Sequence, residues 1–167
     1  MKALNIFILL TLLFACKAQR PSSIQKVNEL VENKIYKPLT IYQGDTSKYM
    51  LENFVTNQEF YKQKPICVLL NRLEVPVKDF LHGPDTDDHL YSTNLSISAY
   101  STLEIEKKIK LKKEPAILVI YWTKPILTAK IDTLLNQKGR IWNKDLADFF
   151  GNQIIDHVGY VKYNINK

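Results

Sequence analysis

The sequence predicts a single small α+β domain, a mainly antiparallel sheet with about four helices on one face, behind an N-terminal export signal. Two patterns predict this fold. Apolar and polar residues alternate over residues 95–111, which is typical of strand, and other segments repeat apolar residues at helical spacing behind capping residues. Of the 167 residues, 46% are hydrophobic. The roughly 150 residues left after removal of a signal can bury about 70% of the unfolded chain's surface, so a core can form without disulfides.

The first residues have the layout of a secretory signal. Lys2 precedes an apolar run, Ala3 to Ala15, and small or polar residues follow. A span across a bilayer takes about 20 apolar residues, so this run is short for a permanent anchor. An uncleaved helix is one alternative reading. A cut between Ala18 and Gln19, which would leave a soluble secreted protein, is the other.

The run ends in Leu13-Phe14-Ala15-Cys16, which resembles the lipobox of bacterial lipoproteins, with Phe14 bulkier than the residue most members carry. The resemblance implies that residues 1–15 are removed and that Cys16 carries the lipid that holds the chain on the membrane. Several acyl chains on one residue give stable anchoring. Lys17 stands where inner-membrane lipoproteins often carry aspartate, so the resemblance implies an outer-membrane lipoprotein, periplasmic or surface-facing.

The remaining chain divides into a short tether, residues 16–22, and one domain, residues 23–167. Capping residues, prolines and apolar spacing predict the elements of its first half. In order, they are a helix over 23–35 that begins at the Ser22 capping box and ends before Pro38, a short strand over 39–44, a helix from its cap Asp45 to Gln63, and a buried strand from Ile66 that contains Cys67.

The second half begins with the alternating segment, 95–111, which predicts one long strand or two joined strands. Ala116 to Trp122 is continuously apolar, which favours a strand covered on both faces. Then follow a helix from Thr128 to Gln137 with Gly139 as its C-cap, a helix from Lys144 to His157 capped by Asn143, and a last strand over 161–165.

The densest group of metal-ligand side chains is the segment HGPDTDDH. Carboxylates and imidazoles can bind a divalent metal, but the segment lacks the glycine and the closing glutamate of a calcium-binding loop. Aspartate and Gly-Pro are also the usual residues of a solvated turn, and we favour a turn over a metal site. The candidate ligands are His82, Asp85, Asp87, Asp88 and His89.

Other candidates for chemistry are few. Cys67 lies among apolar neighbours, so we expect a core residue rather than a nucleophile. His157 is expected at the C-terminal end of a helix, where a cationic side chain interacts favourably with the helix dipole. No phosphate-binding loop, nucleophile elbow, HExxH or CxxC motif occurs. We therefore predict no catalytic residues and no cofactor.

Two groups of residues suggest binding. The formal charge is +6, and much of the excess lies in KKIKLKK, with lysines at Lys107, Lys108, Lys110, Lys112 and Lys113. Lysines protect exposed edge strands from pairing, which is the interpretation we favour, and a patch for anionic headgroups is the alternative. Trp142, between polar neighbours, is a candidate surface contact, whereas Trp122 is expected in the core. An exported chain meets little nucleic acid, so acidic envelope partners or headgroups are the expected counterparts.

A second resemblance covers Pro65 to Lys124. The segment resembles the plug domains of outer-membrane receptors in its Pro-initiated apolar strand and its late ILVIYWTK strand, but lacks the glycines expected after the first strand. The sequence thus supports three hypotheses. The leading one is a non-enzymatic, lipid-anchored envelope protein that binds a partner or supports an assembly. The others are a small metal-dependent hydrolase that uses residues 82–89 and a plug-like receptor accessory.

Overall fold

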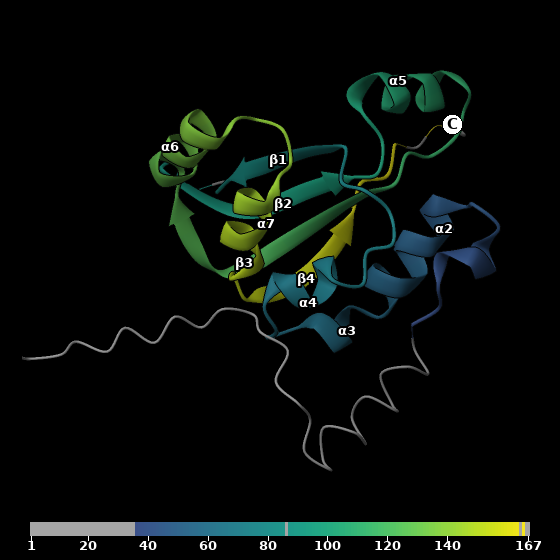
Figure 1. Ribbon diagram of the computed structural model, residues 1–167, viewed down its shortest axis with the longest axis horizontal. Coiled ribbons are helices and arrows are strands. Elements are labelled where there is room, and N and C mark those ends of the chain that lie inside the picture. The colour runs from purple at the N-terminus through teal and green to yellow at the C-terminus, as the bar shows by residue number, and fades with distance from the viewer. Residues whose placement is uncertain (1–35, 86, 164, 166–167) are drawn as a thin grey trace, which may run out of the picture.

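The structure, a computed structural model, describes residues 36–85, 87–163 and 165. The expected signal peptide, Cys16, the tether and the helix over 23–35 lie outside the described residues. The described chain forms an antiparallel four-stranded sheet in the order β1-β2-β3-β4 (Figure 1). Its strands are β1 (Asp79–Pro84), β2 (Tyr91–Ser98), β3 (Ile117–Leu127) and β4 (Ile155–Tyr160). The predicted α+β class is confirmed, with six α-helices in the described part of the chain.

The sheet has one buried and one partly open face. On β3, Leu118, Ile120 and Trp122 are buried, while Val119 and Tyr121 on the opposite face are only half-buried. Successive side chains of a strand point to opposite faces of the sheet. The burial of alternate residues therefore shows that the helices cover only the face that carries Leu118, Ile120 and Trp122. The expectation that β3 is covered on both faces is therefore wrong. The helices α3 (Gln58–Tyr61), α4 (Ile66–Leu70) and α7 (Lys144–Gly151) lie over the buried face (Figure 1).

The regular elements of the described segment before the sheet are all helices. A 3-10 helix, η1 (Leu39–Tyr42), replaces the strand expected over 39–44. It ends where Gln43 and Gly44 adopt positive φ values of 51° and 86° and turn the chain into the next helix. Asp45 then accepts a hydrogen bond from the Lys48 amide at 3.0 Å, which confirms it as a helix cap. The helix consists of α2 (Thr46–Met50), a π-helical stretch η2 (Leu51–Thr56) and α3 (Gln58–Tyr61).

The buried strand expected from Ile66 is a short helix, α4 (Ile66–Leu70). Its first amide donates to the Gln153 carbonyl at 2.8 Å. Its side chains pack against α7, where a Cβ added to Gly151 would lie 3.3 Å from the Cβ of Cys67. Cys67 is half-buried on this helix. A five-residue apolar run fits either strand or helix, and here contact with α7 decides.

The alternating segment 95–111 contains a strand and then a helix. β2 ends at Ser98, and α5 (Thr102–Lys110) begins behind Ser101. Ser101 and Glu104 form a reciprocal capping box, the local signal for this helix start. The five lysines of residues 107–113 therefore lie at the end of a helix. The interpretation of this run as a protected edge strand is wrong.

The last two helices are close to the prediction. α6 (Thr128–Lys138) ends at Gly139, whose φ of 85° suits glycine. α7 (Lys144–Gly151) begins at Asn143, whose side chain accepts from the Leu146 amide at 3.1 Å. It ends at Gly151 rather than at the expected His157, because the chain turns there into β4. β4 consequently starts six residues before the strand expected over 161–165.

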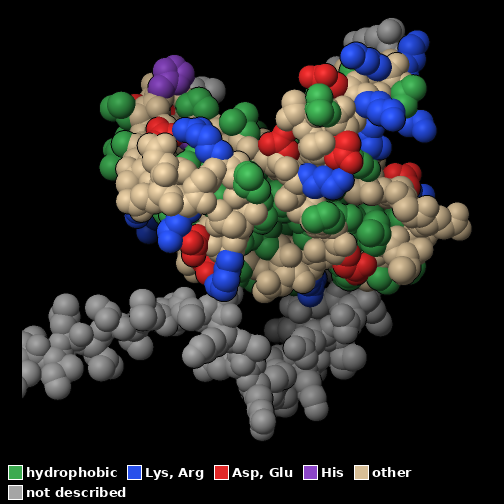
Figure 2. Space-filling view, turned by 45° about the horizontal axis from the view of Figure 1, so that its top comes forward, with side chains coloured by type: hydrophobic (Ala, Val, Ile, Leu, Met, Phe, Trp, Pro, Cys, Tyr) green, Lys and Arg blue, Asp and Glu red, His purple; other side chains and the backbone are tan. Residues whose placement is uncertain are grey.

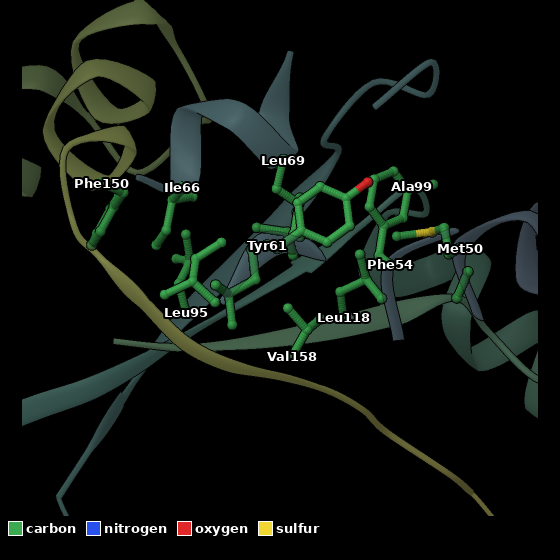
Figure 3. Close-up of a cluster of buried hydrophobic side chains, with 14 of the residues drawn as sticks. Met50, Phe54, Tyr61, Ile66, Leu69, Leu95, Ala99, Leu118, Phe150 and Val158 are labelled. Carbon is green, nitrogen blue, oxygen red and sulfur yellow. The ribbon is translucent and has the colours of Figure 1, made fainter. Parts of the chain in front are cut away.

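The core lies between the buried face of the sheet and these helices (Figure 3). Tyr61, Ile66 and Leu69 project from the helices toward the sheet residues Leu95 and Leu118 (Figure 3). All five side chains are at most 1% exposed. Every buried hydrophobic residue of the described chain falls between residues 42 and 158.

Candidate interaction surface

The segment HGPDTDDH is divided between a strand and a turn. His82 lies in β1 on the helix-covered side, with 15% of its side chain exposed and its Nε2 3.9 Å from a carboxylate oxygen of Asp132. Its Nδ1 is buried without a hydrogen-bond partner among the described residues. Burial lowers the pKa of His82, the Asp132 carboxylate opposes this shift, and Arg140 adds to it. The neutral imidazole is thus the favoured form.

The acidic residues of the segment shape the hairpin turn between β1 and β2. Asp85 accepts a hydrogen bond from the Asp87 amide at 2.9 Å, and Asp88 accepts one from the Leu90 amide at 3.0 Å. These are Asx turns, the local role we favoured for these aspartates. His89 is exposed in the same turn. In the described chain, no three histidine, cysteine or acidic side chains lie where they could jointly hold a metal ion.

The helix α5 is joined to the body of the domain at its N-terminal end. Glu104 accepts hydrogen bonds from Lys78 at 2.8 Å and from the Ser101 amide at 2.8 Å. These bonds lower the pKa of Glu104 to about 2. Thr102 donates to Asp79, at the start of β1, at 2.8 Å. The first turn of α5 is therefore held against the sheet, and the rest of the helix projects from the molecule (Figure 1).

The projecting helix has no buried residue. Leu103 is 77% exposed and Leu111, just after the helix, is 58% exposed. The C-terminal half of α5 and the residues just after it carry the α5 lysine cluster, which we define as Lys107, Lys108, Lys110, Lys112 and Lys113. Basic side chains gather over this helix at the upper right of Figure 2. The helix thus presents apolar and basic side chains to solvent together.

A groove of about 300 Å³ lies between α5 and the open face of the sheet. Leu81 and Ile117 line it from the sheet, Ile105 lines it from α5, and Val161 and Tyr163 line it from the segment after β4. Leu81 is 68% exposed. No sequence pattern predicted this groove, because residues 95–111 were expected to form strand and no element was expected over residues 79–84.

The two tryptophans have different surroundings. Trp122 is 5% exposed and donates to the Ser92 carbonyl at 2.8 Å, which confirms it as a core residue. Trp142 is half-buried and stacks on Phe150, with ring centroids 6.3 Å apart. It also meets the edge of Phe80 at 5.4 Å. Part of the Trp142 ring therefore packs against the edge of the core, and only the remainder is available for a surface contact.

The open face of the sheet carries an aromatic pair that the sequence analysis missed. Tyr121 of β3 stacks on His157 of β4 with ring centroids 4.1 Å apart. His157 also contacts the Asp156 carboxylate at 2.8 Å. The expected role of His157 at a helix end is wrong, because β4 has replaced the end of that helix. Cross-strand register brings the two rings together.

No helix in the described part of the chain is long and apolar enough to cross a bilayer. No protein-family model, curated protein or solved structure matches this chain.

Proposed function

We propose that this chain is an exported, lipid-anchored envelope protein whose folded domain binds a partner or a surface and does not catalyse a reaction. The observation that carries the proposal is the N-terminal segment, in which a short apolar run ends in Leu13-Phe14-Ala15-Cys16. Such a run is too short for a permanent span and has the layout of a cleaved signal. The proposal assigns Cys16 as the lipidated residue.

The domain supports a binding role. Its metal-ligand candidates are used locally, since Asp85 and Asp88 close a turn and His82 faces α6. The surface at α5 combines exposed leucines, a lysine cluster and a shallow apolar groove. Exposed apolar residues with charged neighbours are typical of interaction surfaces rather than of water-excluding active sites. The plug-like alternative requires a strand after Pro65, but Ile66–Leu70 is helical.

The test is the intact mass of the N-terminal peptide from membrane-extracted protein, compared with a Cys16→Ala variant. Acyl mass on Cys16, absent from the variant together with membrane retention, is the expected result. An unmodified N-terminus at Gln19 would overturn the proposal and identify a soluble secreted protein.

The same measurement reports on the two cysteines. The sequence contains two cysteines, Cys16 and Cys67. A sulfur bonded to lipid cannot also form a disulfide, so the two states of Cys16 exclude each other. A Cys16–Cys67 disulfide in the exported protein would refute lipidation, and acyl mass on Cys16 would support it.

A further inference from the structure

We propose that α5 docks the domain onto the surface of an anionic phospholipid bilayer through its lysine cluster and the neighbouring exposed leucines. The structure brings together a helix without buried residues, two exposed leucines and five lysines. A helix with one basic face and a few exposed apolar side chains lies in the plane of a membrane interface and binds anionic lipid by charge and by shallow insertion.

The described part of the domain does not neutralise the charge of the cluster. None of the five lysines forms an ion pair with a carboxylate of the described residues, although Lys108 lies 4.2 Å from the centre of the Tyr100 ring. Lysines elsewhere do form such pairs, as Lys138 does with Asp145 at 3.0 Å. At the start of α5, Glu104 pairs with Lys78. The exposed Glu106 is the remaining acidic residue on the helix.

The helix dipole does not account for the whole cluster. Lysines in a last helical turn are favoured by the partial negative charge there, and Lys107, Lys108 and Lys110 occupy that turn. The effect falls off beyond the helix end, where Lys112 and Lys113 lie. Lys112 also adopts a φ of 53°, in a position that ordinarily favours glycine. A lysine is therefore present where local geometry favours a residue without a side chain.

This inference rests on the proposed lipid anchor, because an anchored domain stays within reach of a bilayer. Twenty peptide steps separate Cys16 from Tyr36, where the described domain begins, and a chain of that length spans at most about 70 Å. A connection of this reach does not by itself impose one orientation on the domain. Contact through α5 would supply the orientation and hold the open sheet face at a defined angle to the membrane.

The test measures vesicle binding without the lipid anchor, so that it can fail independently of lipidation. The chain from Lys17 to Lys167 retains every buried residue of the described core. We expect it to bind phosphatidylglycerol-containing vesicles and not pure phosphatidylcholine vesicles, with binding that weakens as salt rises. Each lysine near an anionic leaflet contributes about fivefold. Replacing Lys107, Lys110 and Lys113 with glutamine should therefore weaken binding roughly 100-fold.

The matched control replaces three exposed lysines outside α5, Lys62, Lys124 and Lys130, with glutamine, which changes the net charge equally. We expect the control to bind nearly as the unmodified chain does. Leu111→Gln should weaken binding without altering its dependence on salt. Equal loss of binding in the control and the α5 variant would overturn the proposal, as would equal binding to neutral vesicles. Thermal melting followed by circular dichroism checks that each variant is folded.

Discussion

The buried amide of Asn53 provides a sharp test of how the start of the domain is held. Asn53 is 2% exposed. Its side chain accepts from the Lys37 amide at 2.9 Å and donates to the carbonyls of Lys37, at 2.9 Å, and Tyr49, at 3.1 Å. These bonds fasten the start of the described chain, at Lys37, to the helical layer.

Replacement of Asn53 by alanine removes three hydrogen bonds. Each contributes about 1 kcal/mol net, so Asn53→Ala should lower the free energy of unfolding by about 2–3 kcal/mol. Asn53→Asp should lower the free energy of unfolding further than Asn53→Ala does at neutral pH, because a carboxylate would face the two carbonyl oxygens. Such a carboxyl has a raised pKa in the folded state, so the penalty should shrink as the pH falls and the group becomes protonated.

The assay is urea unfolding followed by tryptophan fluorescence, since the buried Trp122 reports loss of the core. Asn152→Ala is the control, because its exposed side chain makes a single hydrogen bond, to the Asp148 carbonyl. The control should change the stability by at most about 0.5 kcal/mol. If Asn53→Ala is as stable as the control, the amide does not hold the segment, and the reasoning is refuted.

Two further predictions concern His82 and Lys112. Burial lowers the pKa of His82 below its ordinary value of 6.5, so the stability that the neutral imidazole contributes is present above pH 6.5 and is lost as the pH falls below it. His82→Phe should flatten this acid-side decline in melting temperature, and an unchanged decline would show that another group causes it. Lys112→Gly should raise the free energy of unfolding by about 0.5–1 kcal/mol, because glycine adopts the positive φ without strain. The same variant should bind anionic vesicles about fivefold less tightly, and a loss of stability in urea unfolding would contradict the argument.

Where local chemistry alone defines an element, the sequence was sufficient. Asp45 and Asn143 cap the helices they were expected to cap, because a side-chain oxygen satisfies amides two or three residues away. Gly139 ends α6 for an equally local reason. The α+β class followed from the same signals, and so did the buried position of Trp122.

The sequence around α5 contains two conflicting local patterns, a helix capping box and an alternation of apolar residues. The expected strand rested on the alternation, which is the wrong one. Ser101 and Glu104 form a capping box, while the odd-numbered apolar positions continue past it. Ile105 and Ile109 fit a strand period and an i,i+4 helix period equally, so periodicity could not separate the two. The lysine residues were identified from the sequence, but their place on a projecting helix emerged only from the structure.

Tertiary structure alone decided the rest. The apolar run Ile66–Leu70 is helical because it packs on α7 and bonds to the Gln153 carbonyl, contacts between segments more than 80 residues apart in the chain. The early end of α7 at Gly151 and the Tyr121–His157 stack depend likewise on the register of β4 against β3. The sequence by itself determined the fold class and the helix caps, because each depends on neighbouring residues. The groove, the open sheet face and the exposure of α5 depend on which distant segments pack together, and no local pattern encodes that choice.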